Sequence, residues 1–138
     1  MTTKPSVLIT VDIIKADLTQ PNELAVVETR LRNDTQIGIL INNAGTSLSG
    51  QFIDQATDDI ELLVTLNTTA LVRLASAVAP RRTQTGQGAI INISSAVALM
   101  PEFGLSVYGA TKAFEAARQA MQPGFAQIQA APRYLGPK

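Results

Sequence analysis

The sequence contains no histidine, no cysteine and no tryptophan, and only 4% of its 138 residues are aromatic. Without histidine, neither a Ser-His-Asp nor a Cys-His catalytic arrangement can form. Without cysteine, the chain has no thiol nucleophile, no disulfide and no Cys/His zinc site. Any acid–base chemistry in this chain must therefore use carboxylates, lysine or tyrosine, and we expect no metal site.

The chain also lacks an excess of charge of either sign, with 11 basic and 11 acidic residues. A neutral balance gives no electrostatic reason to expect a nucleic-acid or anionic membrane partner. The longest uninterrupted apolar runs have about five residues, far fewer than a bilayer span requires. The sequence therefore predicts one soluble, cytoplasmic domain without a targeting or membrane segment.

Three short runs rich in β-branched residues predict strands, at Val7–Val11, Ile37–Ile41 and Ala89–Ile93. Each run is nearly continuous in apolar character, which is typical of strands buried on both faces of a parallel sheet. The polar segment Thr83–Gly88 is expected to form the turn into the last strand.

Helical patterns lie between and after these runs. They predict helices from about Thr19 to Leu31, from Ala56 to Ala79 with Pro80 as its stop, and from Ser106 to Met121. The order β-α-β-α-β-α predicts an α/β fold with right-handed crossovers over residues 1–121. Residues 122–138 are rich in proline and glycine without a period, and we expect an irregular tail there.

Tyr108 and Lys112 are four residues apart in the last predicted helix, which places both side chains on one helix face. An ammonium group beside a phenol stabilises the phenolate, so this tyrosine could act as a general acid or base without histidine. The alternative is an ordinary amphipathic helix. Taken alone, the pattern favours that alternative, because Tyr-x-x-x-Lys arises often by chance.

Polar residues also follow two predicted strands, at Asn42–Gly45 and at Ser94-Ser95. Ligands of doubly wound sheets bind beyond the carboxyl ends of the strands, and Ala44-Gly45 would let a flat ligand approach the backbone. Turn formation and helix capping explain the same residues without a ligand. Asn67 lies within a long apolar helix, where a buried amide needs a polar partner, structural or functional.

Together these residues resemble the short-chain dehydrogenase/reductase family. The resemblance covers about Val7 to Met121 and rests on Asn-Asn-Ala-Gly after a strand, an Asn in the next helix, Ser-Ser after the next strand, and Tyr-x-x-x-Lys. It implies a Rossmann-like doubly wound parallel sheet, present here in part as three β-α units. It also implies hydride transfer between NAD or NADP and a small carbonyl or alcohol substrate.

The resemblance assigns roles residue by residue. Tyr108 matches the general acid/base, and Lys112 matches the lysine that stabilises the tyrosinate and holds the nicotinamide ribose. Ser95, rather than Ser94, matches the serine that orients the substrate carbonyl, and Asn67 matches the asparagine that keeps a water in the proton relay. The cofactor side would be lined by Asn43, Ala44 and Gly45, with Asp17 and Leu18 at the adenine.

The family's glycine-rich turn, T-G-x-x-x-G-x-G after a first strand, is absent from the sequence. That turn holds the cofactor pyrophosphate, and the sequence aligns from the family's third strand onward. We therefore expect the middle of a reductase, with the catalytic residues but without most of the cofactor cradle. The alternative is a non-catalytic fragment that forms a homo-oligomer through the helices at 56–79 and 106–121.

Overall fold

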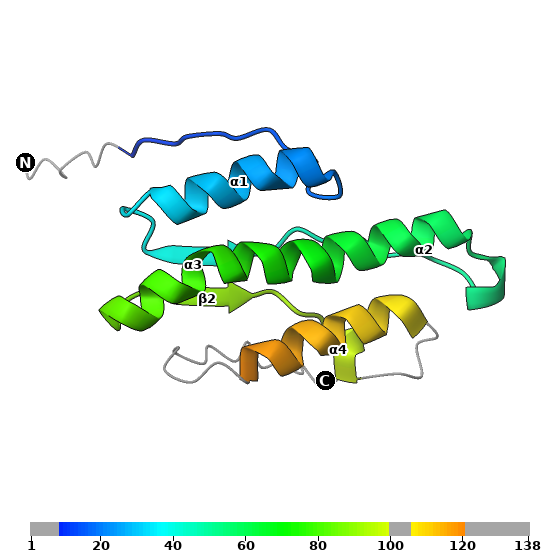
Figure 1. Cartoon of the computed structure of the whole chain (residues 1–138). Coiled ribbons are helices and arrows are strands. Elements are labelled where there is room, and N and C mark those ends of the chain that lie inside the picture. The colour runs from blue at the N-terminus through cyan, green and yellow to red at the C-terminus, as the bar shows by residue number, and fades with distance from the viewer. Residues whose placement is uncertain (1–8, 100–105, 121–138) are drawn as a thin grey trace, which may run out of the picture.

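The computed structural model describes residues 9–99 and 106–120, so the predicted tail over residues 122–138 lies outside the described residues. A parallel pair of strands and the helices around it form the fold (Figure 1). In chain order the elements are α1 (Pro21–Asn33), β1 (Ile39–Asn42), η1 (Phe52–Asp54), α2 (Thr57–Val64), η2 (Thr65–Ala70), α3 (Leu71–Thr85), β2 (Ala89–Asn92), η3 (Ala96–Leu99) and α4 (Ser106–Ala120).

The sheet confirms two of the three predicted strands. β1 and β2 run parallel, with Ile39 opposite Ala89 and Asn42 opposite Asn92. The chain returns from the end of β1 to the start of β2 through one long helical run, α2–η2–α3, as a parallel pair requires. The result is the partial α/β arrangement that the sequence predicts, with α1 and α4 on either side of the long helix (Figure 1).

The strand predicted at Val7–Val11 is not formed in its described part, residues 9–11. Ile9 and Val11 are 80% and 74% exposed. A strand needs a neighbour to bond its backbone, and the described sheet consists of β1 and β2 alone. The apolar composition of this run therefore produced a wrong prediction for these three residues.

Burial on both faces of the strands is also wrong for the described residues. Leu40 and Ile90 point to one face and are buried, whereas Ile39 and Ile41 point to the other face and are each 58% exposed. Helix α3 contacts both strands, and α1 packs against α3. The helices thus cover the Leu40 face of the sheet.

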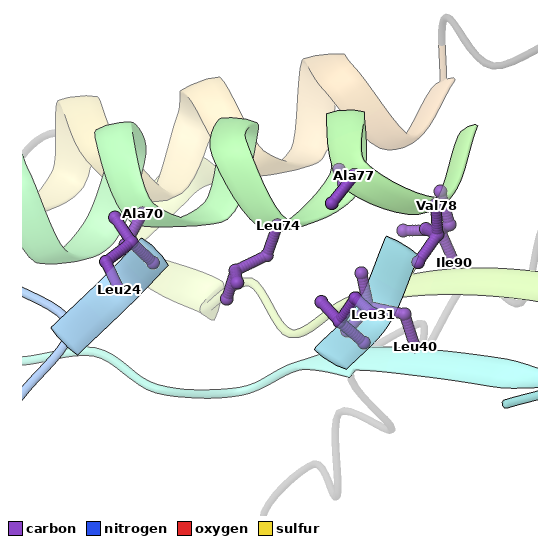
Figure 2. Packing of buried hydrophobic residues seen from close by; sticks show 9 residues of the cluster. Leu24, Leu31, Leu40, Ala70, Leu74, Ala77, Val78 and Ile90 are labelled. Atoms are coloured by element: carbon purple, nitrogen blue, oxygen red, sulfur yellow. The ribbon is translucent and has the colours of Figure 1, made fainter. Parts of the chain in front are cut away.

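The core lies between α1, α3 and the two strands, and Figure 2 shows its side chains. Helix α1 begins with Pro21, whose missing N–H costs nothing in a first turn. Leu24 and Leu31 lie on the same face of α1 and are buried. Val27 lies on that face too and packs against the same cluster, as the helical spacing of the three residues predicts. The remaining buried members are Leu40, Ala70, Leu74, Ala75, Ala77, Val78 and Ile90.

Pro80 does not end its helix, contrary to prediction. Helix α3 continues to Thr85 and stops at Gly86, which has a left-handed φ of 66° and donates its N–H to the Arg82 carbonyl. Beyond the proline, Arg82 is buried and donates to the carbonyls of Ile37 and Gln87. These contacts offset the one helical hydrogen bond that Pro80 cannot make.

The continuous helix Thr57–Thr85 has 29 residues and a mean hydropathy of 1.5 in its most apolar window. By length and composition alone it is long and apolar enough to cross a membrane, unlike the shorter runs considered in the sequence. About 44% of that window is buried inside the molecule. Core helices of globular proteins have the same features, so this helix is weak evidence for a membrane span.

Candidate active site

The carboxyl ends of β1 and β2 meet at one edge of the sheet. Asn42 and Asn92 are paired in register there, and the Asn42 Nδ2 donates to the Asn92 Oδ1 at 3.0 Å. This amide contact ties the two strand ends together. It brings the segments that follow the strands, Asn43–Gly45 and Ser94-Ser95, to the same side of the molecule.

Asn67 is fully buried in the π-helical segment η2. Its Oδ1 accepts the Thr46 N–H at 2.9 Å, and its Nδ2 donates to the Thr46 carbonyl at 2.9 Å. The same Nδ2 donates to the Thr111 Oγ1 on α4 at 3.0 Å. Asn67 thus joins the loop after β1 to η2 and to α4. These bonds provide the polar partners that a buried amide requires.

Tyr108 and Lys112 lie on the first turns of α4. The Lys112 Nζ is 5.8 Å from the centre of the Tyr108 ring, which places the ammonium close to the phenol. The Thr111 hydroxyl between them donates to the Tyr108 carbonyl at 2.8 Å. Helical spacing therefore brings the two side chains together as the sequence predicts.

The Lys112 side chain is buried, with 7% of it exposed. Its Nζ donates to the Ile93 carbonyl at 3.1 Å and to the two carboxylate oxygens of Glu115 at 3.0 and 2.9 Å. Burial raises the pKa of Glu115, and the hydrogen bond from Lys112 opposes that rise. An ion pair thus fixes the ammonium at the end of β2.

The two serines after β2 have different roles. The Ser94 Oγ donates to the Lys112 carbonyl at 2.7 Å and anchors α4 to the strand end. The Ser95 Oγ accepts the Val97 N–H in a long contact of 3.4 Å at the start of η3. Ser94 is thus committed to a strong backbone bond, whereas no acceptor within residues 9–99 and 106–120 takes the Ser95 hydroxyl proton.

A cavity of about 300 Å³ collects these groups. Five of the predicted site residues line it, and Asn67 lies directly behind it through its bonds to Thr46. The complete lining is Asn43, Gly45, Thr46, Ser47, Ile93, Ser94, Ser95, Tyr108 and Lys112. The predicted residues outside this lining are Ala44, which lies next to it in the chain, Asp17 and Leu18.

Asp17 and Leu18 lie before α1, in a turn of their own. The Asp17 carboxylate accepts the N–H and the hydroxyl of Thr19 at 2.9 and 2.7 Å, and these hydrogen bonds hold the pKa of Asp17 below its usual value. Leu18 packs against the hydrophobic core. Their described contacts account for a stable turn, and their predicted place at an adenine stays a prediction.

Sequence reasoning missed two partners of the site residues, Thr46 and Glu115. Thr46 engages Asn67 through its backbone, so its side-chain type gives no signal. Glu115 follows Lys112 by three residues, and that helical spacing could have revealed the ion pair.

Among residues 9–99 and 106–120, no group of three or more His, Cys, Asp or Glu side chains could hold a metal ion.

The cavity therefore combines a phenol, an ammonium, a free serine hydroxyl and exposed loop backbone. The phenol can exchange a proton, the ammonium can stabilise a phenolate or donate hydrogen bonds, and the hydroxyl can donate to a carbonyl oxygen. This set supports proton transfer at an oxygen atom without histidine. Its position beyond the ends of parallel strands is where doubly wound sheets bind ligands.

The sequence profile of the short chain dehydrogenase family matches residues 6–123. Among solved structures, a bulky-bulky ketone specific alcohol dehydrogenase from Comamonas testosteroni is 57% identical, with a TM-score of 0.79 over 81% of this chain and 45% of that one. A short-chain dehydrogenase from Sphingobium yanoikuyae in complex with NADPH is 61% identical, with a TM-score of 0.76 over 78% of this chain and 42% of that one.

Among curated proteins, an NADP-dependent 3-hydroxy acid dehydrogenase of Salmonella typhi is 35% identical over 107 residues, which are 75% of this chain and 43% of that protein. The chain thus spans less than half the length of these relatives. The profile match nevertheless covers most of this chain, and the solved relatives share its fold at high identity. The chain belongs to the short-chain dehydrogenase family.

Proposed function

We propose that this chain carries the catalytic centre of an NAD(P)-dependent oxidoreductase that interconverts a small carbonyl compound and its alcohol in the cytoplasm. The convergence of Tyr108, Lys112 and Ser95 on one cavity, with Asn67 behind it, carries the proposal. The names of the relatives support it, because they include a ketone-specific alcohol dehydrogenase, an NADPH complex and an NADP-dependent dehydrogenase.

The residues present fit the nicotinamide end of such a cofactor. The loop at Gly45 approaches the site closely, since a Cβ at this position would lie 3.3 Å from the Lys112 Nζ and 3.1 Å from the Asn67 Oδ1. We propose that the backbone of Asn43, Ala44 and Gly45 lines the cofactor side and that Lys112 holds the ribose hydroxyls. Asp17 and Leu18 are proposed for the adenine end.

The bound nicotinamide supplies or accepts the hydride at the substrate carbon. In reduction, the Tyr108 hydroxyl gives its proton to the developing alkoxide oxygen, so one hydride and one proton are added to the carbonyl. The Ser95 hydroxyl donates a hydrogen bond to that oxygen and orients it. Lys112 stabilises the tyrosinate that remains, and Asn67 keeps the water through which Tyr108 regains a proton.

Titration of the purified chain with NADPH and NADH, followed by assay against a panel of ketones and alcohols, tests the proposal. Because the sequence lacks the glycine-rich turn that holds the cofactor pyrophosphate, we expect weak cofactor binding with turnover. We expect Tyr108→Phe to keep that binding while losing at least about 100-fold in rate. Tyr134→Phe, at the other tyrosine of the sequence, is the matched control. A chain that neither binds cofactor nor turns over substrate would contradict the proposal and favour the non-catalytic alternative.

An apolar groove supports a second proposal, that two copies of the chain associate through η2–α3 and α4. The groove has about 470 Å³, and its lining includes Val64 and Phe114, which are 37% and 42% exposed. Val72, Val107 and Ala110 continue the same apolar surface. Sedimentation velocity is the test: we expect a dimer that Phe114→Glu dissociates, whereas a wild-type monomer at all concentrations would contradict this proposal.

A further inference from the structure

The Glu115 carboxylate is the partner of the lysine that the proposed function places at the cofactor ribose. Glu115 is 1% exposed, and its two oxygens lie 3.0 and 2.9 Å from the Lys112 Nζ. The Ile93 carbonyl accepts a further bond from the same Nζ at 3.1 Å. A lysine ammonium has three N–H donors, and three acceptor oxygens of the protein lie within hydrogen-bond distance of it.

This arrangement conflicts with two tasks of Lys112 in the proposed reaction. Donating to ribose hydroxyls requires N–H groups that the protein does not already occupy, and a carboxylate beside the ammonium weakens the stabilisation that its charge gives to a phenolate. Glu115 takes up two donors and places a carboxylate beside the charge. A ribose hydroxyl that bonds Lys112 therefore competes with the Glu115 oxygens and the Ile93 carbonyl for the same ammonium.

We propose that Glu115 is a positioning residue that holds the Lys112 ammonium in an internal ion pair and thereby weakens its contact with the cofactor ribose. This inference rests on the proposed function. Because the pair is buried, water does not compete for the ammonium, and the ligand itself must displace the carboxylate. Glu115 thus lowers the affinity of the site for its cofactor.

The surroundings of Lys112 make Glu115 the relevant charge. On α4, the other titratable or charged residues are Tyr108, one turn before Lys112, and Arg118, three positions after Glu115. Outside α4, the described hydrogen-bond partner of the ammonium is the Ile93 carbonyl, which is uncharged, and a Cβ added at Gly45 would lie 3.3 Å from the Nζ. Among the described ion pairs, Lys112 has Glu115 as its sole partner.

Acylation of lysine amines in the purified chain, resolved by peptide mass spectrometry across a pH series, tests the ion pair directly. Lys15 is exposed and serves as the internal reference. We expect Glu115→Gln to accelerate Lys112 acylation about tenfold at each pH of the series, because the amine loses the carboxylate that holds it. Glu115→Asp, which keeps the charge, should retain most of the protection, and Glu61→Gln, at an exposed glutamate, should leave it unchanged.

Titration of the same variants with NADPH tests the consequence for the cofactor, and we expect Glu115→Gln to bind about tenfold more tightly than wild type. Equal acylation rates in wild type and Glu115→Gln would overturn the inference, as would equal NADPH affinities. Faster acylation with NADPH binding to neither chain would support the ion pair and overturn the proposed function instead. The two failures are therefore distinguishable.

Discussion

The Asn67 side chain bonds both the N–H and the carbonyl of Thr46, at 2.9 Å each. A side-chain amide has one acceptor oxygen and two N–H donors. The Asn67 amide therefore pairs with the N–H and the carbonyl of Thr46, as the backbone of a neighbouring strand residue would. The loop after β1 therefore holds its shape through a helix and not through the sheet. Any change at Asn67 consequently affects the cavity and the stability of the loop together.

We expect Asn67→Ala to lower the free energy of unfolding by about 1 to 2 kcal/mol, because three hydrogen bonds are lost while the exposed Thr46 backbone can bond water instead. Urea denaturation measures the change. Asn33→Ala, at an exposed asparagine of α1, makes the same substitution and should change stability by less than about 0.5 kcal/mol. Equal losses in the two variants would show that the Thr46 contacts contribute nothing.

Gly45→Ala should displace the groups that surround the loop. The added Cβ would lie 3.1 Å from the Asn67 Oδ1 and 3.3 Å from the Lys112 Nζ, closer than ordinary van der Waals contact. We expect shifted NMR signals of the Asn67 side-chain amide and a stability loss of about 1 kcal/mol. The control is Gly38→Ala, where a Cβ meets nothing within 4 Å and the signals should stay in place.

The ion pair of Glu28 predicts a pH dependence of stability. Glu28 is buried and accepts hydrogen bonds from Arg73 at 2.5 and 2.9 Å, and these bonds hold the pKa of Glu28 below its ordinary value of 4.5. A lowered carboxyl pKa contributes stability above the ordinary value, and that contribution is lost as the pH falls through the lowered one.

Glu28→Gln should therefore cost about 1 kcal/mol at neutral pH, since Arg73 is partly exposed and solvent screens the pair. The difference between variant and wild type should shrink below pH 4.5. Thermal unfolding across an acid pH series measures both effects. Glu61→Gln, at an exposed carboxyl, provides the reference, and a Glu28→Gln difference that persists at low pH would contradict this assignment.

Leu24→Ala should destabilise the protein by about 2 to 5 kcal/mol, because Leu24 is 2% exposed and its truncation leaves a cavity between α1 and the long helix. Leu62→Ala makes the same change at a side chain that is 47% exposed. We expect that control to cost less than about 1 kcal/mol. Chemical denaturation of both variants compares the two sites, and similar losses would place the core elsewhere.

The sequence predicted much of this arrangement because local periodicity controls it. The face of α1 and the one-turn relation of Tyr108 to Lys112 follow from spacing within a single element, and the parallel direction of the strands follows from the long helical connection between them. The strand prediction at Val7–Val11 failed in residues 9–11 because pairing depends on a neighbour. Pro80 was wrong as a helix stop because tertiary contacts of Arg82 outweigh the missing hydrogen bond.

The contacts that complete the site involve residues far apart in the chain. Asn67 meets Thr46 and Thr111 across 21 and 44 positions, and no short pattern records such distances. Thr46 bonds Asn67 through its backbone, so the residue type at position 46 does not indicate the contact. Glu115 lies outside the family's Tyr-x-x-x-Lys motif, although its i+3 spacing from Lys112 on the helix predicts the ion pair.

The π-helical segment η2 has a geometric consequence for the whole helical run. One residue corresponds to about 100° of rotation on an α-helix, and a π turn contains an extra residue. The segment therefore sets the rotation of α2 about the helix axis relative to α3. Helix α2 packs on α4, whereas α3 packs on α1 and the strands. Removing one residue from Thr65–Ala70 would therefore rotate α2, which packs on α4, relative to α3, which packs on the core.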